Sequence, residues 1–230
     1  MILSLTNLTF QYPDTEIPVF RTLNFSLDSP GFHALFGASG VGKTSFARIV
    51  AGELTGFSGQ LYIKDKSIVL YSYNQERLPG WGTIRHFIDS TTPSSMIEMK
   101  KQLIDIFGLS DCINLRFSQL SLGQKNRVNL IRYLLQEFDL LIMDESLANV
   151  DERLRETIIL KIKESFPDRY FLYISHNLME ITKFSDTILI FRDIEKIPQT
   201  LTLKGLDIAS REMPDRDRLE TTVLEVMNAC

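Results

Sequence analysis

A glycine-rich stretch in the first fifth of the chain has the composition of a phosphate-binding loop. It runs from Gly37 to Thr44 and fits the pattern G-x-x-x-x-G-K-[ST]. Glycine lets the backbone turn so that several N–H groups converge on one anion, and the following helix directs its positive end at the same point. The lysine adds a charge for the outer phosphates, and the threonine hydroxyl can bind Mg²⁺. The candidate site comprises Gly37, Ala38, Ser39, Gly40, Val41, Gly42, Lys43, Thr44 and Ser45.

Two adjacent acids, Asp144 and Glu145, follow the apolar run Leu140–Met143. A magnesium–triphosphate site needs a carboxylate at the end of a strand beside the phosphate loop. Asp144 is therefore predicted to join the Mg²⁺ shell, and Glu145 to orient or deprotonate the attacking water. Paired acids at a strand end can also belong to an ordinary solvated loop. The presence of a phosphate loop in the same chain favours the catalytic interpretation.

Short, nearly continuous apolar runs predict the strands that position these residues. Such runs are typical of a parallel sheet covered on both faces. The runs are Phe32–Phe36, Leu140–Met143, Tyr170–Ile174 and Thr187–Phe191, and helical patterns follow three of them at Gly42–Ala51, Asp151–Phe166 and Leu178–Phe184. Strand alternating with helix indicates an α/β fold with crossover connections. Alternating apolar residues in 2–10, and a second candidate strand at Val19–Leu27, precede this core.

The middle of the chain has a different character. Three helical stretches are predicted there, at Thr83–Asp89, Ser95–Phe107 and Leu122–Phe138. We interpret residues 76–138 as a helical subdomain inserted into an α/β core of residues 1–75 and 139–230, within one domain of residues 1–230. A further strand at Gln199–Leu203 and a terminal helix complete the prediction. Leu219, Val223 and Met227 recur at helical spacing in that helix and are expected to face the core.

Composition excludes several classes of protein. The 230 residues carry 25 basic and 29 acidic side chains, a net charge of −4, which disfavours a nucleic-acid-coating surface. The apolar runs are far shorter than the roughly 18 residues that span a bilayer. The first ten residues lack a secretory signal, and two cysteines form neither a disulfide framework nor a metal site. These features predict a reduced, soluble, cytosolic protein.

The chain resembles the ATPase subunits of ABC transporters over nearly its whole length. A third motif lies between the glycine-rich loop and the Asp144–Glu145 pair. It reads Leu120-Ser121-Leu122-Gly123-Gln124 and is similar to the family's LSGGQ signature, with Leu122 in place of the first glycine. The stretch Ser146 to Asp151 is similar to the D-loop, whose aspartate falls on Asp151. The resemblance implies a P-loop NTPase core, a mostly parallel sheet flanked by helices with an N-terminal antiparallel β portion.

Three further positions carry the resemblance. Gln75 stands where the family has its Q-loop glutamine, and His176 stands where the family has its switch histidine. Tyr12 stands where an aromatic residue stacks on adenine. Departures from the usual pattern occur at Leu122, at Ser146 in place of proline, and at Asn177 in place of aspartate. None of these departures removes a charge or donor that the chemistry requires.

The resemblance implies a mechanism in which two subunits face head to tail and close on two ATP molecules. Lys43, Thr44, Asp144 and Gln75 of one subunit would hold phosphate and Mg²⁺, with Thr44, Gln75 and Asp144 as metal ligands. Ser121 and the N–H of Gly123 of the other subunit, beside Gln124 and Asp151, would complete the site. Glu145 would polarise the water, and His176 would stabilise the transferring phosphoryl group.

The resemblance also implies partners. A second ATPase subunit in a homodimer, transmembrane permease subunits and a solute-binding protein are expected, with this chain peripheral on the cytoplasmic face of the membrane. The sequence from Leu78 to Thr83, Leu-Pro-Gly-Trp-Gly-Thr, looks like that of importer ATPases for nitrate, sulfonate, taurine and thiamine precursors. Two alternatives remain open. One is an ABC ATPase for lipid or lipoprotein extraction or cell-division control, and the other is a nucleotide-binding regulatory module with little hydrolysis.

Overall fold

A six-stranded sheet forms the centre of the computed structural model, which describes residues 1–78, 82–210 and 215–230. The Pro79–Trp81 part of the predicted importer pattern lies outside the described residues. The strand order is β5-β6-β7-β3-β8-β9. All neighbouring pairs are parallel except β8 and β9, which are antiparallel. The strands are β3 (Gly31–Gly37), β5 (Val69–Tyr73), β6 (Leu140–Asp144), β7 (Tyr170–Ile174), β8 (Thr187–Phe191) and β9 (Thr200–Lys204). The mostly parallel sheet of the prediction is therefore confirmed.

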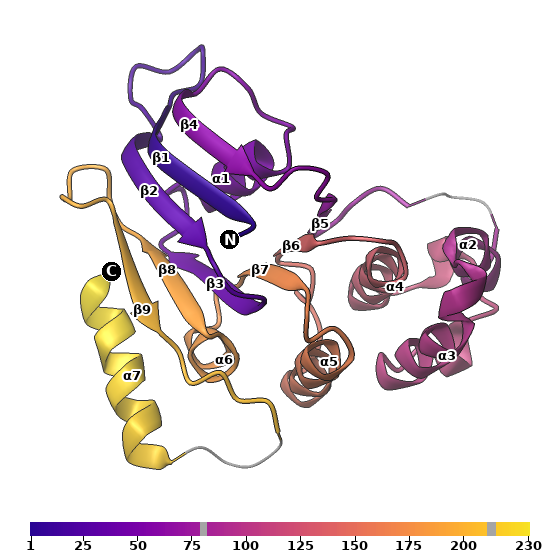
Figure 1. Ribbon diagram of the computed structural model, residues 1–230. Coiled ribbons are helices and arrows are strands. Elements are labelled where there is room, and N and C mark those ends of the chain that lie inside the picture. Colours follow the sequence, from indigo (N-terminus) through magenta and orange to yellow (C-terminus); the bar gives the residue numbers. More distant parts are fainter. Residues whose placement is uncertain (79–81, 211–214) are drawn as a thin grey trace.

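Both faces of this sheet are covered, which explains the continuous apolar runs of its strands (Figure 1). Leu140 and Ile142 of β6 belong to a core with α1 (Lys43–Val50), whereas Leu141 and Met143 belong to a core on the opposite face. Helices α5 (Glu152–Ser165) and α6 (Leu178–Phe184) cover that second face. Because successive strand residues point to opposite faces, a strand such as β6 must be apolar along its length to contribute to both cores.

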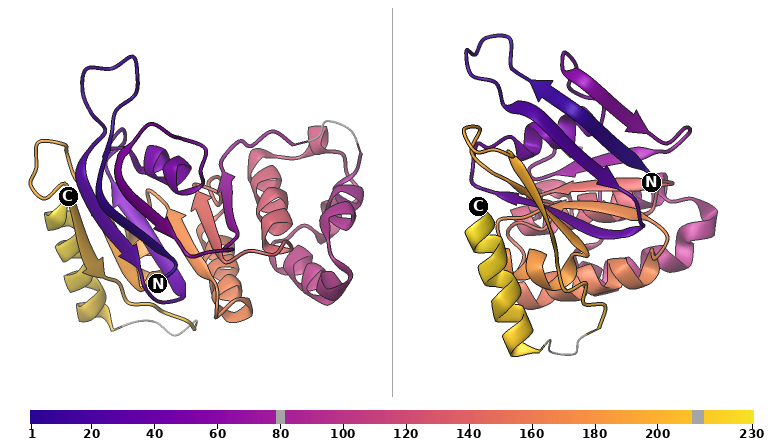
Figure 2. Two further views of the ribbon diagram at one scale, coloured as in Figure 1. Left: turned by 45° about the horizontal axis from the view of Figure 1, so that its top comes forward. Right: turned by 60° about the vertical axis from the view of Figure 1, so that its left-hand side comes forward.

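A smaller antiparallel sheet packs over α1 (Figure 2). Its strand order is β2-β1-β4, with β1 (Leu3–Phe10), β2 (Phe20–Leu27) and β4 (Ser58–Ile63). The first two strands were predicted, and β4 was not. Strand β4 begins Ser58-Gly59-Gln60 and has no buried residue, so it lacks the apolar pattern that identified the others. It is an edge strand whose pairing to β1 supplies its order.

Three helices lie beyond the β5 edge of the large sheet (Figure 1). They are α2 (Ile84–Thr91), α3 (Ile97–Ile106) and α4 (Leu122–Leu134), with 3-10 turns at Ser94–Met96, Ser110–Cys112 and Phe117–Gln119. Helix α4 ends four residues before the predicted Phe138. The chain must turn there to enter β6, because the N–H groups of Asp139 and Leu140 donate to the carbonyl of Ile68 beside β5.

The C-terminal helix α7 (Arg216–Ala229) packs on α6. The predicted core stripe is wrong at Met227, which is 57% exposed, while Thr222 and Val226 are buried. Thr222 is tolerated on the buried face because its hydroxyl donates to the carbonyl of Arg218 at 2.9 Å. Among the described residues, none of the helices has the length and apolar character to cross a membrane.

Candidate phosphate-binding site

The predicted phosphate loop joins the carboxyl end of β3 to the amino end of α1. Glycine is required at both ends of the loop, because a side chain would not fit there and because the backbone has a positive φ. A Cβ on Gly37, whose φ is +147°, would lie 2.3 Å from the carbonyl oxygen of Phe191. Gly42 precedes α1 with a φ of +100°, and a Cβ there would lie 2.4 Å from Cγ1 of Val19. The two glycines therefore allow the loop to lie against β8 and the start of β2.

The lysine of the loop folds back over it. Lys43 is only 7% exposed, and its Nζ donates to the carbonyls of Gly37 and Ala38, each at 2.8 Å. Burial lowers the pKa of Lys43, and the nearby carboxylates of Asp144 and Glu145 partly oppose that shift. The ammonium group is thus held at the mouth of the loop.

Thr44 and Asp144 meet beside the loop, as the sequence predicted. The Thr44 hydroxyl donates to Oδ2 of Asp144 at 2.8 Å, and the hydroxyl of Tyr71 donates to the same oxygen at 3.0 Å. Burial raises the pKa of Asp144, and the two hydrogen bonds partly oppose the rise. A hydroxyl and a carboxylate side by side are the hard oxygen donors that Mg²⁺ prefers, so these residues fit the implied metal.

Tyr71 was missed by sequence reasoning. It lies on β5 opposite Ile142 of β6, two residues before the acid in the parallel register. The signal available in the sequence was a tyrosine inside an apolar strand, which needs a hydrogen-bond partner when buried. The identity of that partner depends on β5 and β6 being neighbours.

Glu145 and His176 form a direct contact. Nε2 of His176 lies 2.7 Å from Oε1 of Glu145, and the two side chains are 52% and 36% exposed. Parallel pairing of β6 and β7 sets Asp144 beside Ile174, so the residues just beyond both strands emerge at the same edge. Glu145 has a φ of +51°, a left-handed conformation that is costly for a residue with a side chain and is concentrated at functional sites.

These groups surround one pocket of about 270 Å³. It is lined by residues of the phosphate loop together with Asp144, Glu145 and His176. Tyr12 follows β1, and its hydroxyl is 3.0 Å from Oγ of Ser45 in the first turn of α1. The structure thus brings these residues together, from segments far apart in the sequence.

Gln75 does not line this pocket. It lines a neighbouring cavity of about 480 Å³ with Leu122 and Asn126. Asn74 is still tied to β6, because its N–H donates to the carbonyl of Asp144 at 3.0 Å. Gln75 then has a φ of +63°, and its N–H is directed at Oδ1 of Asn126 in α4. The chain therefore turns from the sheet edge toward α4 at the predicted glutamine.

The signature-like segment forms the start of α4. The Ser121 hydroxyl accepts from the N–H of Gln124 at 3.2 Å, and Oε1 of Gln124 accepts from the N–H of Ser121 at 2.9 Å. This reciprocal capping box explains why a serine and a glutamine stand three residues apart. Ser121 and Leu122 are exposed, but Gly123 is buried. A Cβ on Gly123 would lie 2.2 Å from the carbonyl oxygen of Asn149.

Asp151 also acts as a helix cap. Its carboxylate accepts from the N–H of Leu154 at 3.0 Å at the start of α5. Ser146, which replaces a proline of the family pattern, is buried and donates to Ser72 of β5 at 2.9 Å. Neither Asp151 nor the Ser121 and Gln124 pair lines the phosphate pocket.

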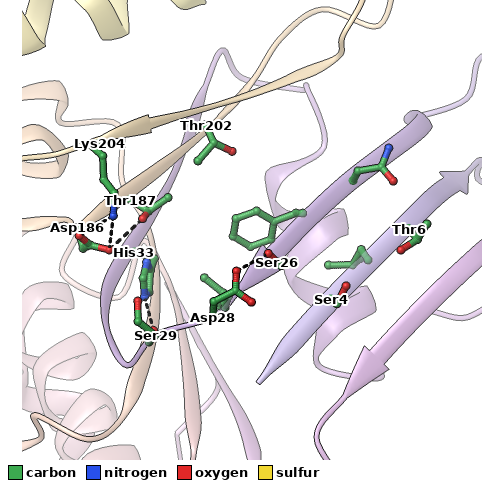
Figure 3. A pocket seen from close by; sticks show the side chains of 14 residues that line it. Ser4, Thr6, Ser26, Asp28, Ser29, His33, Asp186, Thr187, Thr202 and Lys204 are labelled. Atoms are coloured by element: carbon green, nitrogen blue, oxygen red, sulfur yellow. Dashed lines mark hydrogen bonds and ion pairs between the residues drawn. The ribbon is translucent and has the colours of Figure 1, made fainter. Parts of the chain in front are cut away.

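A separate cavity of about 580 Å³ lies between the two sheets, at the opposite end of β3 (Figure 3). His33 of β3 lines it, 2% exposed, with Nε2 3.0 Å from the carbonyl of Ser29. Burial lowers the pKa of His33. Asp186 and Lys204 form an ion pair of 3.0 Å on its wall. His33 is therefore part of the packing between the strands, at the end of β3 away from the phosphate loop.

Comparison with known proteins identifies relatives of this chain. The model of the family described as ABC transporter matches residues 20–148. The chain is 28% identical over 206 residues to the spermidine/putrescine import ATP-binding protein PotA of Mycoplasma capricolum subsp. capricolum, covering 82% of this chain and 58% of that protein. It is 27% identical over 206 residues to the molybdenum import ATP-binding protein ModC of Saccharophagus degradans, covering 81% and 56%. The chain thus spans a little over half the length of these relatives.

A solved structure has the same fold. It is that of a bacterial Atm1-family ABC exporter with ATP bound, and it aligns with a TM-score of 0.77 at 20% identity. The alignment covers 98% of this chain and 41% of the exporter chain.

Proposed function

Because this chain belongs to the ABC transporter family, we propose that it is the ATP-binding subunit of an importer and that it hydrolyses ATP to drive solute uptake. The observation that carries the proposal is the convergence of three parts on one pocket. These parts are the phosphate loop with Lys43, the Thr44–Asp144 pair and the Glu145–His176 pair. The first binds phosphate, the second suits a metal, and the third can activate water.

Phosphate binding rests on the loop and on Lys43. Its Nζ already lies against the loop carbonyls, so a triphosphate entering the loop exchanges those contacts for phosphate oxygens. The lowered pKa of Lys43 reflects burial of a charge that an anion would neutralise. Tyr12, whose hydroxyl lies beside Ser45, would stack on the adenine ring.

Thr44 and Asp144 would hold Mg²⁺ beside the bound phosphates. When bound, the ion neutralises charge on the phosphate oxygens. Tyr71 fixes the carboxylate of Asp144 from the side of β5. Gln75 would reach the metal and the water from the neighbouring cavity if α4 and the turn after β5 move toward the pocket.

Glu145 is the base that orients and deprotonates the attacking water, and His176 contacts the γ-phosphate. Their contact of 2.7 Å holds the two side chains together at one edge of the sheet. Both are partly exposed, so water and nucleotide can reach them. The presence of an acid at position 145 disfavours a non-hydrolysing regulatory module.

A second subunit, facing head to tail, would complete the site. Ser121 and Leu122 lie exposed at the start of α4, whose N-terminus suits an anion. Ser121, the N–H of Gly123 and the neighbouring Gln124 would then face the γ-phosphate of the partner, and Asp151 would lie at the subunit interface. Monomers should therefore bind ATP but hydrolyse it slowly.

We assign the remaining partners to the same proposal. The two import ATP-binding relatives and the sequence from Leu78 to Thr83 support work with permease subunits and a solute-binding protein, on the cytoplasmic face of the membrane. The same sequence supports a solute of the nitrate, sulfonate, taurine or thiamine-precursor group. Residues 76–138 would form the helical lobe, and residues 1–75 and 139–230 the catalytic lobe. Identifying the membrane chain that co-purifies from native membranes tests this part.

The Glu145→Gln variant tests the hydrolytic proposal. It keeps the shape of the side chain and removes the base, so ATP binding should persist while kcat falls about a hundredfold or more. ATP should then hold the variant as a dimer, measured by gel filtration with light scattering. Glu152→Gln, in the exposed first turn of α5, is the matched control and should leave turnover unchanged. Unchanged kcat in Glu145→Gln would contradict the assignment.

A further inference from the structure

Glu180 is a buried acid that the proposed reaction does not use. Within the part of the chain that the structure describes, the buried Lys, Arg, Asp and Glu side chains are Lys43, Asp144 and Glu180. The first two belong to the phosphate pocket. Glu180 lies on α6, is 4% exposed, and follows His176 by four residues. A buried carboxylate is costly without partners, so its partners indicate what it stabilises.

The partners of Glu180 come from β7, from the turn that follows it and from α5. The hydroxyl of Tyr173 on β7 donates to Oε1, and the hydroxyl of Ser175 donates to the same oxygen at 3.1 Å. Nε of Arg155, on α5, lies 2.5 Å from Oε2. Burial raises the pKa of Glu180, and the Tyr173 hydrogen bond and the Arg155 charge oppose the rise. The charge of Arg155 and two donating hydroxyls thus compensate the buried carboxylate.

The same contacts fix the backbone on both sides of His176. Oγ of Ser175, held by Glu180, accepts from the N–H of Asn177 at 3.1 Å. Oδ1 of Asn177 accepts in turn from the N–H of Glu180 at 3.1 Å, which caps α6. The residues before and after His176 are therefore locked to one carboxylate-bearing residue. His176 itself is half exposed, so its position relative to Glu145 depends on this backbone.

We propose that Glu180 is a positioning residue that holds the His176 turn so that its imidazole meets Glu145. Arg155 extends the same network to α5, one turn after Asp151 at the amino end of that helix. The turn that carries His176 and the turn that carries Asp151 are thus joined through one buried ion pair. This inference rests on the proposed ATPase function, in which His176 contacts the γ-phosphate.

The test compares ATP hydrolysis by the full-length chain and by its Glu180→Gln variant. The amide keeps the volume but cannot neutralise Arg155, so the turn loosens while the phosphate loop stays intact. We expect kcat to fall about ten- to a hundredfold, since a displacement near 1 Å can cost that much, with the KM for ATP changed less than about twofold. Glu156→Gln is the matched control, because the Lys183–Glu156 ion pair of 2.8 Å also joins α5 to α6 without contacting the His176 turn. That variant should keep its kcat.

A double-mutant cycle with His176→Ala separates positioning from a general structural role. If Glu180 acts through His176, adding Glu180→Gln to His176→Ala should lower kcat by less than about twofold further. Additive losses, or an equal loss in Glu156→Gln, would overturn the inference. If Glu180→Gln does not fold, Ser175→Ala replaces it in the same cycle, because it breaks the link to Asn177 and leaves the ion pair. Absence of ATP hydrolysis by the wild-type chain would instead overturn the proposed function.

Discussion

The hydroxyl of Tyr71 donates a 3.0 Å hydrogen bond to Oδ2 of Asp144 from the neighbouring strand. Burial, and next the charge of Asp144, raise the pKa of Tyr71, so its hydroxyl remains a donor. The same oxygen accepts from Thr44 at 2.8 Å. A carboxylate held from two sides is oriented before a metal arrives, which lowers the cost of assembling the site.

Replacing Tyr71 with phenylalanine tests this orientation. Tyr71→Phe removes one donor, so we expect the Mg²⁺ concentration for half-maximal ATP hydrolysis to rise about three- to tenfold. The free energy of unfolding should fall by about 1 kcal/mol. Tyr73→Phe is the control, because the ring of Tyr73 lies 5.3 Å from that of Tyr71 but Tyr73 is 40% exposed. An unchanged Mg²⁺ dependence in Tyr71→Phe would contradict a role for the hydroxyl.

The raised pKa of Asp144 predicts a pH dependence of stability. The folded chain holds this carboxyl proton more tightly than the unfolded chain, because burial disfavours the carboxylate. The contribution of the group to stability is therefore present at low pH and is lost as the pH rises through its folded-state pKa. Asp144→Asn removes this titration. The Tm of the variant minus that of the wild type should therefore increase from about pH 4 to about pH 7.

Thermal melts without nucleotide or Mg²⁺ measure that difference. Asp139→Asn serves as the comparison, since Asp139 precedes the same strand but is partly exposed and paired to Arg169 at 3.0 Å. If the Tm difference between Asp144→Asn and the wild type stays constant over this pH range, burial does not shift the pKa of the Asp144 carboxyl.

Gly123 is predicted to stabilise the fold, independently of any role in catalysis. Gly123→Ala would place a Cβ 2.2 Å from the carbonyl oxygen of Asn149, which forces α4 and the turn before α5 apart. We expect the free energy of unfolding in urea to fall by about 1–3 kcal/mol. Leu122→Ala, at the exposed neighbouring position, should change it by less than about 0.5 kcal/mol. Equal stability of the two variants would refute the close approach.

Ser121 allows the completion of the site by a second subunit to be tested without disturbing α4. Aspartate caps a helix as well as serine does, so Ser121→Asp should fold normally. Its charge would oppose the γ-phosphate of the partner subunit, so ATP hydrolysis should fall at least about tenfold while ATP binding by the monomer stays within about twofold. Ser121→Thr should retain hydrolysis. A loss of ATP binding by monomeric Ser121→Asp would place Ser121 in its own nucleotide pocket instead.

The sequence by itself determined the elements whose signals are contiguous. The phosphate loop is one unbroken run of residues, and the strands Tyr170–Ile174 and Thr187–Phe191 and the helix Leu178–Phe184 were predicted to the residue. Their apolar runs are continuous because both faces of the sheet are buried, and their ends are marked by polar residues. Strand β4 was not predicted, because an exposed edge strand needs no apolar pattern.

Only the tertiary structure decided which side chains meet. The order β5-β6-β7 places Tyr71 beside Asp144 and Glu145 beside His176, and no local pattern specifies the order of parallel strands joined by long crossovers. The contact of Gly123 with Asn149 and the burial of Glu180 against Arg155 likewise join segments that are distant in the sequence. Local sequence sets backbone preference and polarity, whereas a hydrogen bond between distant side chains requires the packed sheet that brings them within reach.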